Sequence, residues 1–403
     1  MPPKFKLKPY CVVLLVMSVL IGCGGRHGTI PPLMSQHFLY GIGFDPNGNC
    51  CTSASIYSFG EDGTGALTPL PGSPVTVAPF SGGEDFQVGL ATDLQGRFLF
   101  IPAEVSAICC HTGLFNVYSI DSNTGTVNSR PIADTSGGGP IVFHPSGKFL
   151  YIASGQAFPP NPRAGCFGID GRDLSTNNLA SLPGSPFSYS QCMQLVSLDP
   201  AGHYLYASGQ LFPFTFKNPM FETYTIDSNT GTLTLISTDS SPGVQPSGPI
   251  LFQSSGKFAY ALNARASGPV IDLYSVNPTT GALTFISTQV NNGLANPLMH
   301  PSGNFLYGCT FVAFGQPCQP VGYRVDANTG ALTAIAGFSL APGTGDTLII
   351  DKSGRYAYAL NGSFGNANQI LVYSIDSSTG LMNQMPNLTT TVPAGLTRIV
   401  AGR

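Results

Sequence analysis

Short apolar runs separated by polar turns recur along almost the whole chain. The clearest example is His144–Tyr151, HPSGKFLY, in which a polar turn with a glycine precedes three apolar residues. The turn glycines of this motif and its close variants stand at positions 96, 147, 202, 256, 303 and 354, which are 51, 55, 54, 47 and 51 residues apart. Phe38-Leu39-Tyr40 preserves the tail of a seventh copy. A repeat of this length is typical of solenoids and propellers.

A second motif follows each copy and joins an aromatic residue to another polar turn. Its clearest form is Tyr224–Thr234, YTIDSNTGTLT, and the other copies begin at Tyr57, Tyr118, Phe167, Tyr274, Tyr323 and Tyr373. The two motifs together define seven units, each with four short strands that we call a, b, c and d. In the third unit we expect them at Ile141–Phe143, Phe149–Ile152, Cys166–Ile169 and near Asn178–Leu182. Apolar residues on both faces of strands a and b predict burial between neighbouring sheets.

The two ends of the propeller segment are complementary. The first unit begins directly at strand b, residues 38–43, whereas residues 393–401 resemble a strand a that lacks its turn. Pairing these two ends would remove an exposed sheet edge, which is how many propellers close. The sequence therefore predicts an all-β fold in residues 37–403, a single seven-bladed β-propeller with four antiparallel strands per blade. We expect it to close by pairing of the C-terminal strand, about 393–401, with the N-terminal blade.

The polar turns have a chemical explanation that needs no ligand. Asp, His or Gln at the first turn position accepts a hydrogen bond from the backbone, and glycine supplies the positive φ. We therefore interpret His144 and His300 as turn residues rather than ligands. The c–d turn, Asp-Ser-Asn-Thr-Gly, is similar to part of a calcium loop, but no bidentate glutamate follows in register, which favours a hairpin turn.

The turns also separate two faces of the predicted propeller. The a–b and c–d turns are nearly uniform and lie on one side, whereas the b–c and d–a connections differ from unit to unit and lie on the other. Function usually resides in variable loops held by a rigid frame. We therefore expect the functional site on the side of the b–c and d–a connections.

The N-terminus has the pattern of an export signal. Lys4, Lys6 and Lys8 precede a short apolar run at 11–20, and Leu20-Ile21-Gly22-Cys23 resembles a bacterial lipobox. The run is shorter than a membrane span requires. We predict a lipoprotein signal peptide at 1–22, lipidation of Cys23 and a linker at 23–36. An ordinary secretory signal is the alternative. The protein is then expected in the cell envelope, anchored to the membrane by its lipid, at the outer membrane or facing the periplasm if the cell is Gram-negative.

Composition narrows the partners. Lysine and arginine number 17 against 20 acidic residues, and three of the lysines belong to the leader, so the mature domain is acidic and has no basic run. We expect no nucleic-acid partner, no cofactor and a monomer. The cysteines of the mature domain other than Cys23 are even in number, which predicts disulfides in an exported protein and argues against a metal site. They are Cys50, Cys51, Cys109, Cys110, Cys166, Cys192, Cys309 and Cys318. Cys309 and Cys318 flank one connection and are the expected pair, whereas the pairing of the adjacent cysteines, Cys50-Cys51 and Cys109-Cys110, stays open.

The repeated motifs carry a family resemblance. IVFHPSGKFLY at 141–151, with VYSIDSNTG at 117–125, resembles the lactonase-type seven-bladed propellers, which include propeller 6-phosphogluconolactonases and fungal carboxymuconate lactonizing enzymes. The resemblance covers residues 37–403 and implies the fold and lactone chemistry. The phosphogluconolactonase-like members carry Arg-His before the His-Pro turn and Asn-Glu after the next strand. This chain has Ile141-Val142-Phe143 and Ala153-Ser154-Gly155 there, so the resemblance supports the fold more strongly than sugar-phosphate hydrolysis.

Two functions remain open at this point. The first is a binding module that holds a carbohydrate, lactone or protein partner on the variable loops. The alternative is a lactone hydrolase, which needs a base to activate water and a cation or amide donors for the oxyanion. The catalytic candidates are Glu84, Glu104 and Arg398, and the candidate ligand-binding residues are Asp85, Arg163, Gln191, Glu222, Arg265 and Asp346.

Overall fold

The computed structural model describes most of the propeller segment. The described residues are 37–44, 54–77, 90–107, 110–136, 140–155, 167–176, 178–187, 192–210, 220–240, 245–265, 268–290, 294–310, 319–341, 344, 347–361 and 367–402. The chain divides into Met1–Met34 and Ser35–Arg403, and the propeller is built entirely from the second unit. The predicted signal peptide, Cys23 and the linker lie outside the described residues.

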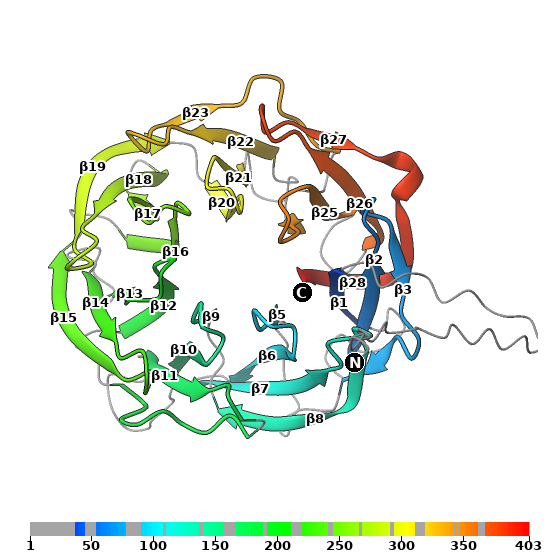
Figure 1. The fold of residues 1–403 in the computed structure, drawn as a ribbon, viewed down its shortest axis with the longest axis horizontal. Coiled ribbons are helices and arrows are strands. Elements are labelled where there is room, and N and C mark those ends of the chain that lie inside the picture. The colour runs from blue at the N-terminus through cyan, green and yellow to red at the C-terminus, as the bar shows by residue number, and fades with distance from the viewer. Residues whose placement is uncertain are drawn as a thin grey trace, which may run out of the picture. The chain divides into compact units, whose positions relative to one another are not determined.

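The described strands form seven antiparallel blades, arranged as a ring in Figure 1. Blade 1 contains β28 (Thr390–Ala401), β1 (His37–Phe44), β2 (Ala54–Glu61), β3 (Leu67–Pro69) and the short β4 (Val75–Thr76). Blade 2 contains β5 (Ala91–Thr92), β6 (Phe98–Ala107), β7 (Cys110–Ile120) and β8 (Val127–Ser136). Blade 3 contains β9 (Ile141–Phe143), β10 (Phe149–Gly155) and β11 (Phe167–Asp173). The predicted fold class is confirmed.

The remaining four blades follow the same order from the inner to the outer strand. Blade 4 contains β12 (Cys192–Leu198), β13 (Tyr204–Gln210), β14 (Met220–Ile226) and β15 (Leu233–Ser240). Blade 5 contains β16 (Gln245–Phe252), β17 (Phe258–Arg265), β18 (Gly268–Val276) and β19 (Leu283–Val290). Blade 6 contains β20 (Leu294–Met299), β21 (Phe305–Thr310), β22 (Gln319–Val325) and β23 (Leu332–Ala334). Blade 7 contains β24 (Ile349–Ile350), β25 (Tyr356–Asn361), β26 (Ala367–Ile375) and β27 (Met382–Gln384), followed by the 3₁₀ turn η2 (Pro386–Leu388).

The ring closes through the C-terminal strand, as the sequence predicted. β28 pairs antiparallel with β1, from Leu39 opposite Ala401 to Gly43 opposite Leu396. The first residues of β28 also pair with β26 of blade 7, so one strand joins the last blade to the first. The two pairings together tie blade 7 to blade 1 through a single strand.

Blade 3 departs from the prediction in two ways. Its expected strand d, near Asn178–Leu182, is reduced to isolated bridges, Arg172 with Ser181 and Ile169 with Phe187. Its strand c is also shifted, because Tyr151 lies opposite Gly171 where the matching Tyr206 of blade 4 lies opposite Thr223. Arg172, not Phe167, therefore occupies the place of the repeated tyrosine. The shift escaped the motif because Phe167-Gly-Ile-Asp170 has the same apolar pattern as the repeated motif but begins five residues before Arg172.

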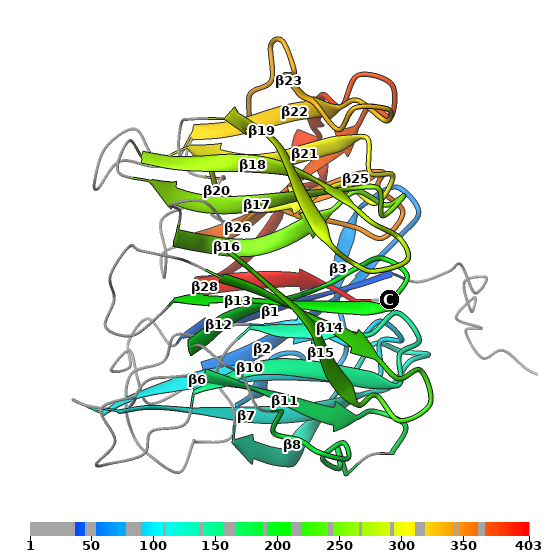
Figure 2. The same ribbon diagram turned by 90° about the vertical axis from the view of Figure 1, so that its left-hand side faces the viewer.

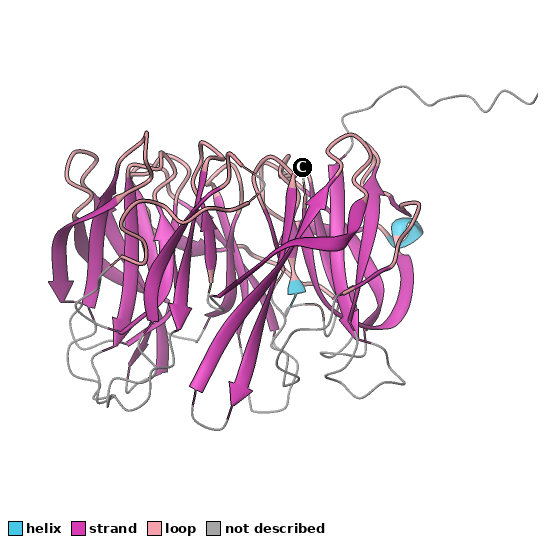
Figure 3. Ribbon diagram, turned by 90° about the horizontal axis from the view of Figure 1, so that it is seen from below, coloured by secondary structure: helices cyan, strands magenta, loops and turns pink. Residues whose placement is uncertain are grey.

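The two predicted faces are present in the described part of the ring. The a–b and c–d turns share one face with the C-terminal end of β28, and the b–c and d–a ends of the strands lie on the other (Figures 2 and 3). We call these the turn face and the variable face. Strand b leaves an a–b turn, so its last residues lie toward the variable face.

The a–b turns are joined into a hydrogen-bonded collar on the turn face. His144 contacts Ser146 Oγ through Nδ1 at 2.7 Å and the Gly202 carbonyl of the next blade through Nε2 at 2.8 Å. His300 makes the same two contacts with Ser302 and Gly354. A carbonyl only accepts, so Nε2 carries the proton in both rings. Both histidines are therefore turn residues, as predicted.

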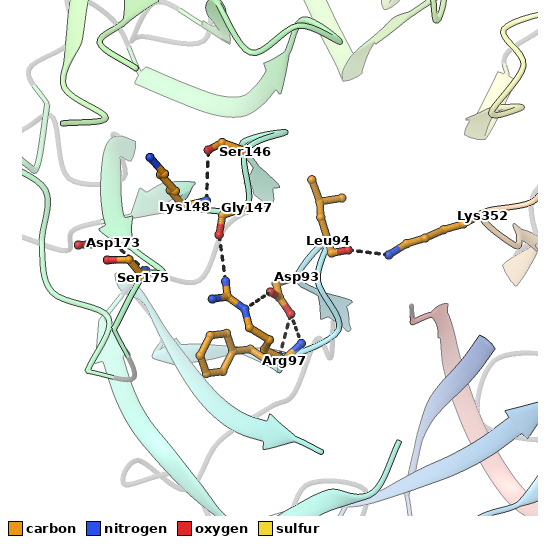
Figure 4. A network of polar contacts seen from close by, with 10 residues as sticks. Asp93, Leu94, Arg97, Ser146, Gly147, Lys148, Asp173, Ser175 and Lys352 are labelled. Atoms are coloured by element: carbon orange, nitrogen blue, oxygen red, sulfur yellow. Dashed lines mark hydrogen bonds and ion pairs between the residues drawn. The ribbon is translucent and has the colours of Figure 1, made fainter. Parts of the chain in front are cut away.

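The collar continues around blades 2 and 7. Arg97 bonds to Asp93 within its own turn at 3.0 Å and donates from Nη2 to the Gly147 carbonyl of blade 3 at 2.9 Å (Figure 4). Lys352 of blade 7 donates to the Leu94 carbonyl of blade 2 at 3.0 Å. This last bond passes over blade 1. Blade 1 has no a–b turn, because its inner strand, β28, is the last strand of the chain.

A second set of bonds links the blades through tyrosine hydroxyls. In six blades a buried tyrosine of strand b donates to the carbonyl of the c–d turn glycine in the next blade, at 2.7 to 3.3 Å. The pairs are Tyr40–Gly125, Tyr151–Gly231, Tyr206–Gly281, Tyr260–Gly330, Tyr307–Gly380 and Tyr358–Gly65. Because both partners are buried and belong to different blades, each bond fixes the register of one blade against the next.

Blade 2 is the exception to this set, and its neighbour has changed with it. Phe100 replaces the tyrosine, and blade 3 has Leu179, with φ of 49°, in its c–d turn. Leu179 packs with Phe98 and Phe100 in one buried cluster. An apolar contact thus replaces the hydrogen bond at this joint.

We expect Tyr260→Phe to lower the free energy of unfolding by about 1 to 2 kcal/mol, because the buried Gly330 carbonyl loses its donor. Urea unfolding followed by fluorescence measures the change. Phe100→Tyr is the matched control, since it adds a hydroxyl opposite the turn of blade 3 that has Leu179 in place of glycine. We expect no increase in its free energy of unfolding. Equal stability of Tyr260→Phe and the parent protein would contradict the interpretation.

Candidate functional site

The predicted site residues fall into three groups. Glu84, Asp85, Arg163, Gln191 and Asp346 lie outside the described residues. Glu104 lies in β6 opposite Gly113, and only its backbone is described. Arg398 is exposed on β28, opposite Ile42. Glu222 and Arg265 are described with their side chains, and only Arg265 is part of a larger polar cluster.

Glu222 is not on the loop rim where the sequence placed it. It lies within β14 and is fully buried, and its Oε2 accepts a hydrogen bond from the Tyr224 hydroxyl at 2.5 Å. Its expected position is corrected because β14 begins at Met220, so the strand has already entered the blade at this residue.

Blade 5 contains a compact polar cluster centred on Asp272. The carboxylate is buried, and Nη2 of Arg265 lies 2.8 Å from both of its oxygens. Asn263 Nδ2 donates to Oδ2 and Thr288 Oγ1 donates to Oδ1, each at 2.7 Å. The register explains this arrangement, because Ala261 and Thr288 both lie opposite Asp272 and residues 261, 263 and 265 share one face of β17.

The cluster leaves hydrogen-bonding capacity unused. Asn263 Oδ1 and Arg265 Nε are buried and have no hydrogen-bond partner. The Arg265 side chain is 31% exposed, whereas that of Asp272 is 1% exposed. Three donor groups already satisfy Asp272, so its role is to orient the guanidinium rather than to accept a proton. The guanidinium retains donors for a carbonyl, carboxylate or phosphate oxygen.

The position of Asp272 is polar in four consecutive blades. Each strand b has one residue directly after its repeated aromatic, and that residue lies opposite one residue of strand c. In blades 2 to 5 this strand-c residue is buried and polar, namely Asn116, Asp170, Glu222 and Asp272. In blades 6, 7 and 1 it is Val321, Leu371 and Tyr57. Asp170 also binds an arginine, Arg172, but that residue follows it toward the turn face. Of these two ion pairs, the Arg265 pair is the one that extends toward the variable face.

Sequence reasoning found Arg265 but missed the three residues that hold it, Asn263, Asp272 and Thr288. A signal was present, since Asp272 interrupts the apolar run Val270–Leu273 inside an expected strand. The unit-by-unit comparison emphasised residues that repeat, whereas these residues differ between units.

Most of the cysteines lie outside the part of the chain whose side chains are described. Cys309 is buried in β21 and disulfide-bonded, and its expected partner Cys318 lies outside the described residues. Cys50, Cys51, Cys109 and Cys166 also lie outside them, and only the backbone is described for Cys110 and Cys192. The described side chains include no group of three or more His, Cys, Asp or Glu arranged to hold a metal ion. No described helix is long and apolar enough to cross a membrane.

The fold and the repeated motifs define a seven-bladed β-propeller. Residues 102–296, from β6 to β20, match the family described as "Lactonase, 7-bladed beta-propeller". This segment contains the four polar positions and the Arg265 cluster. The chain thus resembles the family that the sequence motifs indicated. None of the curated proteins matched the chain.

Solved structures show the same fold at low sequence identity. A Bacteroides uniformis protein assigned by name as a 6-phosphogluconolactonase is 16% identical, with 91% of this chain and 100% of that one covered and a TM-score of 0.64. A protein of the same assigned name from Bacteroides fragilis is 19% identical, with 91% and 98% covered and a TM-score of 0.60. The periplasmic gluconolactonase of Pseudomonas aeruginosa is 16% identical, with 92% and 99% covered and a TM-score of 0.60.

Proposed function

We propose that the protein binds a small ligand of the lactone or sugar-acid class at the variable face of blade 5. The observation that carries this proposal is the guanidinium of Arg265, which Asp272 orients while Nε remains unpartnered and the side chain stays partly exposed. A lactone offers a carbonyl and ring hydroxyls, and its hydrolysed form offers a carboxylate. The free acceptor Asn263 Oδ1 beside the guanidinium suits a hydroxyl of such a ligand.

Hydrolysis of the lactone is the second candidate function. The family match of residues 102–296 and the gluconolactonase name of a structural neighbour favour it. In this reaction water attacks the carbonyl carbon, the ring C–O bond breaks and a hydroxy acid forms. Arg265 would stabilise the oxyanion. Glu84 and Glu104 remain the proposed bases, and Arg398 remains a proposed second cation.

We also propose that the protein is exported and held at the membrane by lipid on Cys23. Lys4, Lys6 and Lys8, the apolar run and Gly22-Cys23 support this part of the proposal. Disulfide bonding of Cys309 agrees with an oxidising compartment. Under this proposal the ligand would be met outside the cytoplasm.

Calorimetric titration with D-glucono-1,5-lactone and its aldonate tests binding. We expect Arg265→Gln to weaken binding about 10- to 100-fold, because a charge-assisted hydrogen bond contributes about 1.5 to 3 kcal/mol. Arg172→Gln is the matched control. It removes the arginine that pairs with Asp170 in blade 3, which lies toward the turn face, so ligand affinity should not change. Equal affinity of the Arg265→Gln variant and the parent protein would disprove the site.

The same samples followed by pH-stat titration separate binding from hydrolysis. Acid release that is lost in Arg265→Gln and in a variant with Glu84, Glu104 and Arg398 neutralised would establish the hydrolase. Binding without acid release would leave the protein a binding module.

A further inference from the structure

The joint between the last and first blades has an acid at a position of strand c that is aliphatic in the other six blades. Glu61 ends β2 in blade 1 and is 5% exposed. In each of the other blades the matching residue is aliphatic. Its backbone N–H donates to the carbonyl of the residue that follows the a–b turn glycine. These residues are Ile120, Leu174, Ile226, Val276, Val325 and Ile375. Six blades thus fill this place with an apolar side chain, and blade 1 alone places a carboxyl there.

A second buried carboxyl, that of Asp351, belongs to the blade 7 side of this joint. Asp351, in the a–b turn of blade 7, is 2% exposed and accepts hydrogen bonds from the backbone N–H groups of Ser353 and Tyr356. Those bonds fix Asp351 in the turn, so it cannot rotate away without opening the turn. The hydroxyl of Tyr358, from β25, donates to the Gly65 carbonyl in the turn that follows Glu61.

The remaining charged groups around Glu61 do not neutralise it. Asp62 follows Glu61 in the chain, and its negative charge raises the pKa of Glu61 further. Arg355 of blade 7 lowers that pKa, but its influence is the smallest. Arg355 lies over the Tyr356 ring, 5.3 Å from its centroid, rather than in an ion pair with Glu61. His37 lies opposite Glu61 in the β1–β2 register. Burial, followed by the charge of Asp351, raises the pKa of Glu61 from 4.5 to about 7.

We propose that the joint between blades 7 and 1 is a proton-dependent clasp, closed when the buried Glu61 is protonated and loosened when Glu61 ionises. Blade 1, which contributes Glu61 to this joint, is also the blade in which strand pairing between the two ends of the propeller segment seals the ring. The buried cluster that contains Tyr356, Tyr358, Leu39 and Phe59 spans the same joint. Charge on Glu61 therefore bears on the contact that completes the ring.

The direction of the pH effect follows from the two states of the protein. The folded state holds the Glu61 proton up to about pH 7, whereas the unfolded chain releases it near its ordinary value of 4.5. The contribution of Glu61 to stability is therefore complete below about pH 4.5 and is lost as the pH rises through 7.

Urea unfolding of the full chain between about pH 5 and about pH 8 tests the proposal, with Glu61→Gln as the principal variant. The glutamine keeps the size and hydrogen-bonding atoms but cannot ionise. We expect the folding equilibrium constant of the parent protein, relative to that of Glu61→Gln, to fall on the order of 100-fold over this range. The same pH dependence in both proteins would overturn the proposal.

Amide hydrogen exchange locates the effect. Faster exchange at high pH in β28, β1 and β25, with no such change in β13 and β17, would support a clasp at this joint. A uniform change in all blades would overturn it. Asp351→Asn is a second variant that keeps an acceptor for the turn, and it should move the transition to lower pH because the charge of Asp351 is removed. A transition that stays in place in Asp351→Asn would also count against the clasp.

Discussion

A chain that lacks residues 393–403 is expected not to fold as a soluble propeller. The deletion removes the part of β28 that pairs with β1, together with the buried side chains of Leu396, Thr397 and Ile399. It also removes the Ala401 carbonyl, to which Thr92 of blade 2 donates at 3.0 Å. Burial of Leu396 and Ile399 alone contributes about 4 to 5 kcal/mol, which is comparable to the whole stability of many domains. Soluble yield and circular dichroism measure the outcome.

A circular permutant is the control for this deletion. Joining Gly402 to His37 by a short turn converts β28 and β1 into an ordinary a–b hairpin, since the two strands are antiparallel neighbours and Gly402 N donates to the Phe38 carbonyl. With new ends in the c–d turn of blade 5, this chain should fold. A deleted chain that melts like the parent protein would disprove closure by β28, and a permutant that fails to fold would argue against the register.

The second large effect is expected for Gly125→Ala, in the c–d turn that receives the Tyr40 hydroxyl. Gly125 has φ of +71°, and a Cβ there would lie 2.2 Å from the Phe38 ring. The variant therefore combines backbone strain of about 1 kcal/mol with overpacking of about 1 to 3 kcal/mol against blade 1. We expect a loss of about 2 to 4 kcal/mol in the free energy of unfolding, measured by urea titration.

Gly337→Ala separates the two causes. Its φ is +75°, close to that of Gly125, but a Cβ there meets nothing within 4 Å. We expect this variant to lose only the strain contribution of about 1 kcal/mol. Equal losses in the two variants would show that Phe38 does not clamp the glycine and that strain accounts for the whole effect.

The repeat could be interpreted from the sequence because its chemistry is local. The turn beginning at His144 needs a side-chain acceptor, and a glycine three residues later, so the motif marks the start of strand b wherever it occurs. The number of blades, the order of strands and the closing strand all follow from counting those turns. Blade 3 shows the limit of this approach, because its strand c lacks the repeated turn glycine and the motif assigned a register that Gly171 opposite Tyr151 excludes.

The candidate site could be predicted only in part. Arg265 was found because it lies near a variable connection, but its partner Asp272 lies on the next strand and repeats in no other blade with an arginine on the variable side. Side chains that act together across β17, β18 and β19 are set by strand register. A unit-by-unit comparison does not measure that register.

The sequence by itself determined the seven-bladed ring, its closure and the division into turn and variable faces, because turn chemistry and apolar alternation act over a few residues. Only the tertiary structure decided which groups meet between blades: Tyr40 with the Gly125 carbonyl, Phe100 with Leu179, and Tyr358 with the Gly65 carbonyl. These pairs are separated by tens to hundreds of residues. Their contacts depend on how whole blades pack, and no local pattern records that packing.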